Sequence, residues 1–358
     1  MTEDSDANRG GDRHNAGDGT RALVTGGAGF IGSHLARRLL EGGARVTVVD
    51  NLSTGRLDNI ADLRDHPGFA FIESDLAAAL AGPLADAEPF DEVYHLAAAV
   101  GVDLVMKNPI LAIEVNVEQT AAVLRYATDR GKPTVFVASS SEVYGKPTRE
   151  VFSEDDDAVY GPTVVRRWSY ALSKALDEQL ALAYHDEGRC PAVVARFFNT
   201  VGPRQVGEHG MVLPRFVRAA LANETIRVFG DGTQSRCFCD VRDVIEAVPK
   251  LVRTPVCHGR VFNIGSDHPI TIAGLADLVT TTLRSASAIE YVPYDKAYPP
   301  GYEDLKRRRP DLSRVRSAIG FEPKTPLERT IADLADDIRR DAERSDTERA
   351  EYSPGAAK

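Results

Sequence analysis

The chain has 358 residues, of which 43% are hydrophobic and 27% are charged, and its net charge is −10 at neutral pH. This length and apolar content predict a folded protein with a large core, in one large or two modest domains. The acidic balance disfavours a nucleic-acid-binding protein, because contacts to phosphates need a basic surface. Scattered histidines without a zinc motif predict no metal site, and no apolar run reaches the about 18 residues of a membrane span.

Both ends of the chain are polar. The first 19 residues are rich in Asp, Gly, Asn and Arg and lack a secretory signal, so we expect a flexible leader. Residues 341–358 predict a polar tail that frays. The four cysteines form no CxxC pair, and at this chain length we expect buried thiols in a reducing cytoplasm rather than disulfides. They are Cys190, Cys237, Cys239 and Cys257.

Strand and helix patterns alternate through the first half of the chain. Short β-branched runs predict buried strands, and amphipathic segments predict helices. The expected strands are residues 21–25, 45–49, 69–73, 92–96, 134–138 and 192–197, and the expected helices are 31–41, 110–130 and 168–187. This alternation is typical of an α/β fold with a doubly wound parallel sheet, the Rossmann arrangement.

The pattern changes after Asn199, where Gly, Pro and Arg separate shorter elements. We expect helices at 214–222, 241–252 and 272–284, strands at 227–229 and 261–264, and a last helix from Pro326. They predict a smaller α+β lobe, over most of residues 199–340, that covers the carboxyl ends of the strands. The sheet domain then spans residues 20–198 and receives a helix and a strand from around 237–265.

Three glycines, Gly26, Gly29 and Gly32, separate the first predicted strand from the first predicted helix. Gly26 permits a tight turn, Gly29 lets the backbone approach a phosphate, and Gly32 lets helix and strand pack closely. The helix N-terminus then presents free N–H groups to a pyrophosphate. A turn without a ligand is the alternative, but Asp50 at the end of the second strand can bind a ribose diol. Because this carboxylate repels a 2′-phosphate, we expect NAD rather than NADP.

Two later strand ends add to the predicted cofactor site. Asp75 follows the third strand, where it can accept a hydrogen bond from an adenine amino group, cap the next helix, or do both. Leu96, Ala97 and Ala98 follow the fourth strand, and small apolar side chains there leave room for a cofactor.

Tyr170 and Lys174 are four residues apart on a predicted helix and therefore share a face. Free tyrosine is a poor base at neutral pH, but a nearby ammonium and an oxidised nicotinamide favour the phenolate and bring its pKa toward working pH. Alone, this pair is common on solvated helices. Ser140, after the fifth strand, favours catalysis because its hydroxyl can orient a substrate hydroxyl toward Tyr170. We therefore expect an enzyme that moves hydride and a proton on a small molecule.

Together these motifs resemble the extended short-chain dehydrogenase/reductases, the nucleotide-sugar epimerase/dehydratase group, over about residues 22–340. The resemblance implies NAD as cofactor, a nucleotide sugar as substrate, and Ser140, Tyr170 and Lys174 as catalytic residues. The cofactor-binding residues that it implies are Gly26, Gly29, Phe30, Ile31, Gly32, Asp50, Asn51, Ser53, Thr54, Gly55, Asp75, Leu76, Leu96, Ala97, Ala98, Asn116, Tyr170 and Lys174. The substrate-binding residues that it implies are Ser141, Asn199, Val212, Arg215, Arg236, Tyr302 and Arg308.

Two segments are further similar to UDP-glucuronate decarboxylases, the UDP-xylose synthases. The Ser-Ser-Glu-Val-Tyr-Gly run at 140–145 implies that Glu142 manages a proton near the sugar C5. The segment from residue 301 implies that Tyr302 stacks on uracil and that Arg308, also a catalytic candidate, faces the sugar carboxylate. Members of the group first oxidise the C4 hydroxyl, so loss of CO₂ from the 4-keto uronate would give a UDP-4-keto-pentose or UDP-xylose.

The chain departs from the decarboxylase pattern in two loops. It lacks a tyrosine before Asn108-Pro109 and an arginine after Gly210. A UDP-hexose or UDP-hexuronate 4-epimerase therefore stays open. A 4,6-dehydratase is less favoured, since Ser141 replaces the aspartate expected for water loss. A redox-silent nucleotide-binding module is the alternative of another class, against which the retained serine, tyrosine and lysine argue.

The same resemblance predicts a homodimer. The two long helices, residues 110–130 and 168–187, can pair with their symmetry mates in a four-helix bundle. We expect a small-molecule substrate, a UDP-sugar such as UDP-glucuronate, and neither nucleic acid nor membrane as partner.

Overall fold

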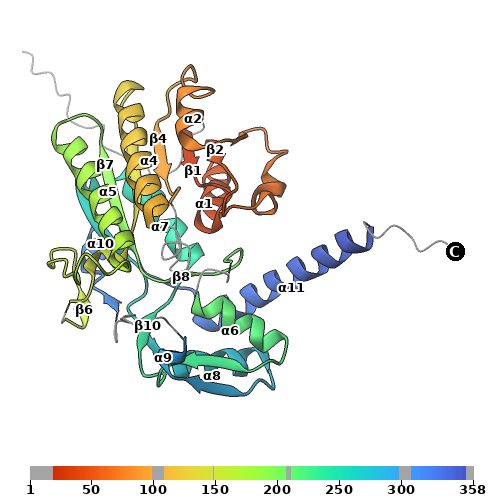
Figure 1. Ribbon diagram of the computed structural model, residues 1–358. Helices are drawn as coiled ribbons and strands as arrows, with labels where there is room; N and C mark the ends of the chain where they lie inside the picture. Colours follow the sequence, from red (N-terminus) through yellow and green to blue (C-terminus); the bar gives the residue numbers. More distant parts are fainter. Residues whose placement is uncertain (1–18, 99–108, 148, 207–210, 298–307, 352–358) are drawn as a thin grey trace, which may run out of the picture.

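The computed structural model describes residues 19–98, 109–147, 149–206, 211–297 and 308–351. A seven-stranded sheet lies at its centre, and all neighbouring strands are parallel (Figure 1). In sheet order the strands are β12 (Arg260–Ile264), β7 (Ala192–Phe197), β5 (Thr134–Ser140), β4 (Glu92–His95), β1 (Arg21–Thr25), β2 (Arg45–Asp50) and β3 (Phe69–Glu73). This is the doubly wound parallel sheet that the alternating pattern predicts.

Helices cover both faces of the sheet, which explains why its strands are apolar without alternation. Successive residues of β1 point to opposite faces, so that Ala22 and Val24 join one hydrophobic core and Leu23 joins the other. The first core is closed by α1 (Phe30–Glu41), α7 (Val241–Arg253) and α10 (Ser313–Ile319), and the second by α2 (Leu76–Ala81), α4 (Pro109–Asp129) and α5 (Trp168–Asp186).

The strand order reverses at β1. From β1 the chain first builds β2 and β3 on one side, and then crosses over to build β4, β5, β7 and β12 on the other. The connections that follow β1 and β4 therefore diverge and leave a crevice at the carboxyl ends of the strands. Ligands of open α/β sheets bind at such a reversal.

A second, smaller lobe has its own hydrophobic core. It is built from α6 (Val212–Leu221), β9 (Ile226–Phe229), α8 (Ile272–Leu283), β14 (Ile289–Val292) and the first half of α11 (Leu327–Glu351). The strands β9 and β14 pair in parallel. Figure 1 shows this lobe below the sheet domain, with the second half of α11 extending away from the body.

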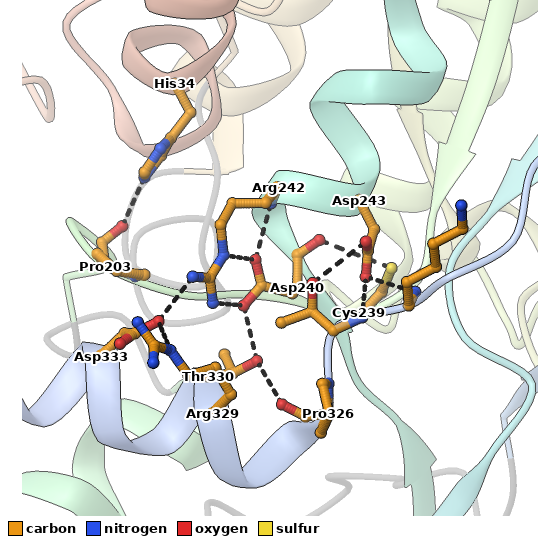
Figure 2. Close-up of polar contacts among 12 residues, drawn as sticks. His34, Pro203, Cys239, Asp240, Arg242, Asp243, Pro326, Arg329, Thr330 and Asp333 are labelled. Atoms are coloured by element: carbon orange, nitrogen blue, oxygen red, sulfur yellow. Dashed lines mark hydrogen bonds and ion pairs between the residues drawn. The ribbon is translucent and has the colours of Figure 1, made fainter.

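A polar joint fastens α11 to the start of α7 (Figure 2). Asp240 caps α7 by accepting a 2.8 Å hydrogen bond from the Arg242 backbone nitrogen, and it also accepts from the Thr330 hydroxyl at 2.7 Å. Arg242 in turn donates to Asp333 of α11 at 2.6 Å. In the first turn of α7, Asp243 accepts from the Thr325 backbone nitrogen at 3.0 Å. The two bodies are therefore held together through one helix start.

Two segments differ from their predicted places. Although α10 falls within residues 199–340, it packs on the sheet domain, because Leu312 and Val315 are buried in the first core. The helix α11 continues to Glu351, into the segment expected to fray. Ion pairs support this extension, from Arg344 to Asp341 within the helix and from Arg56 to Asp341 across to the sheet domain. The predicted leader lies outside the described residues, except for its last position.

The sequence patterns also miss several two- and three-residue strands, such as β6 (Val151–Phe152), which pairs with β15 (Arg309–Pro310). Among the described residues, no helix is both long enough and apolar enough to cross a bilayer. All four cysteines are buried thiols, as predicted.

Candidate active site

A cavity of about 760 Å³ lies at the carboxyl ends of the strands, between the sheet domain and the lobe. Its walls come from the turn after β1, the ends of β2, β4 and β5, the start of α5, and lobe residues from α6 and β10 (Ser235–Cys237). The cavity therefore occupies the crevice that the strand order creates.

The glycine turn forms a backbone cradle on one wall of the cavity. Gly26 has a φ of +70°, and a side chain there would also place its Cβ 2.8 Å from the Ala97 nitrogen. A Cβ at Gly32 would collide with the Gly26 carbonyl oxygen. Gly29 sits at the N-cap of α1, whose first N–H groups face the turn. The cradle fits a dinucleotide pyrophosphate, because backbone replaces side chains where the phosphates approach.

Asp50 ends β2 beside this cradle. Its carboxylate accepts hydrogen bonds from the backbone nitrogens of Ala28 at 2.9 Å and Leu52 at 2.8 Å. Burial raises the pKa of Asp50, and these backbone bonds oppose the rise. Each oxygen keeps a second lone pair for a ribose hydroxyl, so the site fits an unphosphorylated adenosine ribose.

Asp75 occupies the N-cap position of α2 but makes no capping hydrogen bond with its side chain. Instead, it accepts a 2.7 Å hydrogen bond from the amide of Asn51. Asp75 lines the cavity together with Asn51 and Asp50. Of its two predicted roles, this geometry suits the contact to adenine and leaves the helix cap unused.

The three candidate catalytic residues meet in the same cavity. Ser140 ends β5 and accepts from the Glu142 backbone nitrogen at 3.2 Å. Tyr170, from α5, lines the cavity near Ser140, and the Ser140 hydroxyl favours the phenolate form of Tyr170. Lys174 lies one turn further along α5 and is buried. The folded chain thus gathers a phenol, an alcohol and an amine from segments that are distant in sequence.

The charge state of Tyr170 differs from the prediction for the protein alone. Burial raises the pKa of Tyr170 well above its usual value, the charge of Glu142 raises it further, and the hydrogen bond from Ser140 opposes the rise. The predicted help from Lys174 is weakened because its ammonium donates a 2.9 Å hydrogen bond to the buried carboxylate of Asp177. The phenol is therefore neutral at pH 7 in this state.

Charged side chains form a cluster next to these residues in the same cavity. Glu142 accepts from Arg308 at 2.7 Å and from Arg167 at 3.4 Å. Burial alone would raise the pKa of Glu142, but the two guanidiniums outweigh it and hold the pKa at about 2. Arg308 also reaches the Ser141 hydroxyl at 3.5 Å. Two guanidiniums and one carboxylate of the described residues thus meet in this part of the wall.

Arg167 was not predicted from the sequence. It precedes Tyr170 by three residues, so a helix places both on one face, and this spacing is the signal that was available. Its partner Glu142 comes from the short helix after β5, and no pattern in the sequence joins these two segments.

The lobe supplies further candidate residues. Arg236 is buried on β10 and donates to the Ser235 carbonyl at 2.8 Å. Arg215 of α6 lies over the Phe229 ring, 4.1 Å from its centroid. Asn199 holds the Cys237 carbonyl with its amide at 3.1 Å. All of them, with Val212, line the cavity.

Most of the predicted cofactor residues also line the cavity, and these are Gly26, Gly29, Phe30, Ile31, Gly32, Asp50, Asn51, Ser53, Thr54, Asp75, Leu76, Leu96, Ala97 and Ala98. Two do not. Asn116 is buried between α4 and α5, where its amide donates to the Ser173 hydroxyl at 3.0 Å. Gly55 is not among the residues that line the cavity, and a Cβ at this position would touch the Asp50 carboxylate. Tyr302 lies outside the described residues.

The family model for the NAD-dependent epimerase/dehydratase family matches residues 22–265. The UDP-N-acetyl-alpha-D-glucosaminuronate decarboxylase of Bacillus cytotoxicus is 41% identical over 315 residues, which cover 87% of this chain and 95% of that protein. The UDP-glucuronic acid decarboxylase 2 of Arabidopsis thaliana is 34% identical over 322 residues, which cover 90% of this chain and 69% of that protein.

Solved structures share the fold. The UDP-glucuronic acid 4-epimerase of Bacillus cereus, in complex with UDP-glucuronic acid and NAD, has a TM-score of 0.79 at 28% identity, and the alignment covers 90% of this chain and 99% of that one. The epimerase Mth375 of Methanothermobacter thermautotrophicus has a TM-score of 0.83 at 26% identity, covering 92% and 95%.

Proposed function

The chain belongs to the NAD-dependent epimerase/dehydratase family, and from that premise we propose that it decarboxylates a UDP-linked hexuronate after oxidising the sugar C4 hydroxyl. The observation that carries this proposal is the buried pair of Arg308 and Glu142, which lies in the cavity that also holds Tyr170. A guanidinium in that place suits a sugar carboxylate, because its fork of N–H donors matches the two oxygens.

NAD is the cofactor of the family, and the glycine cradle and Asp50 fit it. Bound NAD⁺ supplies the acceptor for the C4 hydride and can return that hydride later in the cycle. We propose that the sheet domain holds this cofactor and that residues of the lobe, with Arg236 foremost, hold the UDP diphosphate. The division follows the two bodies that line the cavity, because the sheet domain contributes the cradle and the lobe contributes Arg215 and Arg236.

Tyr170 performs the first proton transfer. As phenolate it takes the proton of the C4 hydroxyl while the C4–H bond breaks, and C4 becomes a ketone. Ser140, which lines the same cavity, orients the same hydroxyl. A positive charge near the phenol must favour the phenolate for this step, since the pKa of Tyr170 is raised in the protein alone.

The ketone makes the sugar a β-keto acid, so the C5–C6 bond can break and the carboxylate leaves as CO₂. The electron pair of that bond stays on the sugar in an enolate over C5, C4 and O4. Arg308 and Arg167 hold the departing carboxylate before the bond breaks. Glu142 is ionised, because its pKa lies near 2, so it accepts a hydrogen bond from a water and does not donate a proton of its own. That water gives a proton to C5 and regains one from solvent, so the loss of CO₂ from the carboxylate consumes one proton overall.

Two substrates fit this proposal. The relative that is 41% identical is named for the 2-acetamido uronate, and those that are 34% identical are named for glucuronate. A 4-epimerase is the second candidate, because the solved structure of a UDP-glucuronic acid 4-epimerase shares the fold at 28% identity. Its reaction keeps the carboxylate.

Mass analysis separates these functions. The purified protein is incubated with NAD⁺ and either UDP-glucuronate or its 2-acetamido analogue. Loss of the mass of CO₂ from the nucleotide sugar supports decarboxylation. Loss of one water, or an unchanged mass with a new C4 isomer, contradicts it.

We also propose a homodimer in the cytoplasm. Five large apolar side chains are exposed on α4 and α5, led by Ile110, which is 70% exposed. The others are Leu111, Ile113, Leu172 and Leu176. Packing both helices against a second copy would cover them. The buried thiols fit a reducing compartment. Light scattering that gives a monomer mass at micromolar concentration would contradict the dimer.

A further inference from the structure

The ion pair between Lys174 and Asp177 is among the most deeply buried in the molecule. Their side chains are 3% and 0% exposed, and the Lys174 ammonium donates to Asp177 Oδ2 at 2.9 Å. Both lie on α5, three residues apart. A carboxylate in such a place is costly unless a cation and hydrogen bonds stabilise it, so its position beside the catalytic lysine calls for a role.

A buried row of polar groups leads to this carboxylate from the cofactor cradle. The Ala97 backbone nitrogen donates to the Thr25 hydroxyl at 3.2 Å, and Thr25 lies 2.8 Å from His95 Nδ1. His95 Nε2 lies 3.1 Å from the Thr120 hydroxyl. Burial raises the pKa of Asp177, and the Lys174 ammonium and the nearby Thr120 hydroxyl oppose this rise. The side chains of this row are 0–1% exposed.

His95 is neutral in this row, because burial lowers its pKa to about 3. Its two ring nitrogens contact the hydroxyls of Thr25 and Thr120, which can each donate or accept a hydrogen bond, so the row carries no charge.

We propose that Asp177 is a positioning residue for the oxidation step, which fixes the Lys174 ammonium in place and offsets its charge at Tyr170. This inference rests on the proposed role of Tyr170 as base. With Asp177 as counter-ion, the phenol stays protonated until a positively charged cofactor ring arrives, so an empty enzyme carries no exposed phenolate. The neutral row through Thr120 and His95 places no second charge beside the carboxylate.

Other charged groups around Tyr170 have partners of their own. From the helix after β5, Glu142 is held by Arg308 and Arg167. On α5, Glu178 is held by Arg196 at 2.7 Å and by the Ser139 hydroxyl. From β4, His95 is neutral. Asp177 and Lys174 are therefore the two charged side chains of α5 whose opposite charges act on the phenol of Tyr170.

Ultraviolet titration of the Tyr170 phenol in the protein without cofactor or substrate tests this proposal. The tyrosinate absorbance of a Tyr170→Phe variant is subtracted from that of its parent, so only Tyr170 remains among the 11 tyrosines. The Asp177→Asn variant keeps the shape of the side chain and removes its charge. The midpoint of the Tyr170 titration should then move to lower pH, because the Lys174 ammonium is no longer offset. The acid limb of the pH profile of kcat should move in the same direction. An unchanged midpoint overturns the proposal.

The matched control is Glu178→Gln, which removes another buried carboxylate of α5 whose partner is Arg196 rather than Lys174. It should leave the Tyr170 midpoint in place, and a shift equal to that of Asp177→Asn overturns the proposal. If Asp177→Asn alone does not fold, the double variant Lys174→Met/Asp177→Asn replaces the pair by neutral groups. It should melt at a higher temperature than either single variant, and additive losses contradict the pairing.

These readouts do not depend on which sugar is processed. Should mass analysis show no decarboxylation while the titration behaves as expected, the proposed reaction fails and the role of Asp177 stands. Should CO₂ be lost while Asp177→Asn leaves the titration unchanged, the proposed reaction stands and the role of Asp177 fails.

Discussion

Single residues in the cavity act through charges that their neighbours set. The Arg308 guanidinium is buried and paired, and Glu142 opposite is ionised at any pH above about 2. Arg167 and Asp177 join this set only in the folded protein, because each is paired across a helix turn or between two segments. The sequence predicted Ser140, Tyr170 and Lys174 through their spacing and their place after strands, whereas a counter-ion such as Asp177 has no spacing signal apart from the lysine that it faces.

Replacement of Arg308 by alanine should lower kcat/KM for a UDP-hexuronate by about a hundred-fold or more, because a buried charge contact worth about 2–5 kcal/mol is lost and Glu142 is left without its main partner. Binding of UDP alone should change by less than about three-fold. Steady-state kinetics and calorimetry measure the two. Arg309→Ala is the matched control, since Arg309 is exposed and does not line the cavity. Equal losses in both variants would remove Arg308 from the uronate site.

The buried histidines predict how stability depends on pH. Burial lowers the pKa of His95 to about 3 and that of His34 to about 4, whereas an unfolded histidine titrates near 6.5. Between these values the unfolded chain binds more protons than the folded one. Stability is therefore complete above about pH 6.5 and falls as the pH drops toward 3, by on the order of a few kcal/mol for His95.

Chemical unfolding measured from pH 7 down to 4 tests this dependence. His95→Gln should flatten the acid slope, since one of the two groups that create it is gone. His268→Gln, at a position that is 86% exposed, should leave the slope as in the parent protein. An unaltered slope in His95→Gln would refute the assignment.

Whole elements were predictable where the sequence has a strong period. The strands β1, β3 and β7 begin and end at the predicted residues, because buried parallel strands are continuous apolar runs bounded by polar turns. The pairing of β6 with β15 was missed, since two residues carry no period and their partner lies more than 150 positions away. The packing of α10 on the sheet domain was missed for the same reason, as burial of Val315 is a tertiary event.

The turn from β1 to α1 gives a prediction at this scale. Gly32→Ala would press a Cβ onto the Gly26 carbonyl oxygen, so the cradle must shift. Affinity for NAD should fall by about ten- to a hundred-fold, because the backbone groups for the pyrophosphate move by a fraction of an ångström to about 1 Å. Calorimetric titration with NAD⁺ measures this, with UDP binding as the internal control. An unchanged NAD affinity would show that the cradle is not the pyrophosphate site.

At the scale of the whole molecule, the position of the lobe over the strand ends depends on the joint in Figure 2. Asp240 serves three partners there, namely the start of α7, the Arg242 side chain and Thr330 of α11. The cavity lies between the two bodies that this joint connects, so its shape follows from the joint. The sequence predicted that a helix and strand from around 237–265 return to the sheet, and it did not predict what ties α11 to them.

Asp240→Asn should lower the free energy of unfolding by about 2–4 kcal/mol, because Arg242 then faces a neutral amide in a partly buried network. Denaturant unfolding followed by circular dichroism measures the change. The matched control is Asp336→Asn, whose ion pair with Arg339 on α11 is more than half exposed and should contribute less than about 0.5 kcal/mol. Similar losses in both variants would show that the joint has no special weight.

The proposed decarboxylation requires that the carboxyl carbon leaves the sugar in this cavity. A UDP-hexuronate labelled isotopically at the carboxyl carbon and followed by nuclear magnetic resonance reports this directly. With NAD⁺ and the native protein the label should leave the nucleotide sugar and appear as CO₂ and bicarbonate, and with Tyr170→Phe it should stay in place. A label that remains in the sugar while the native protein inverts C4 would contradict decarboxylation and identify an epimerase.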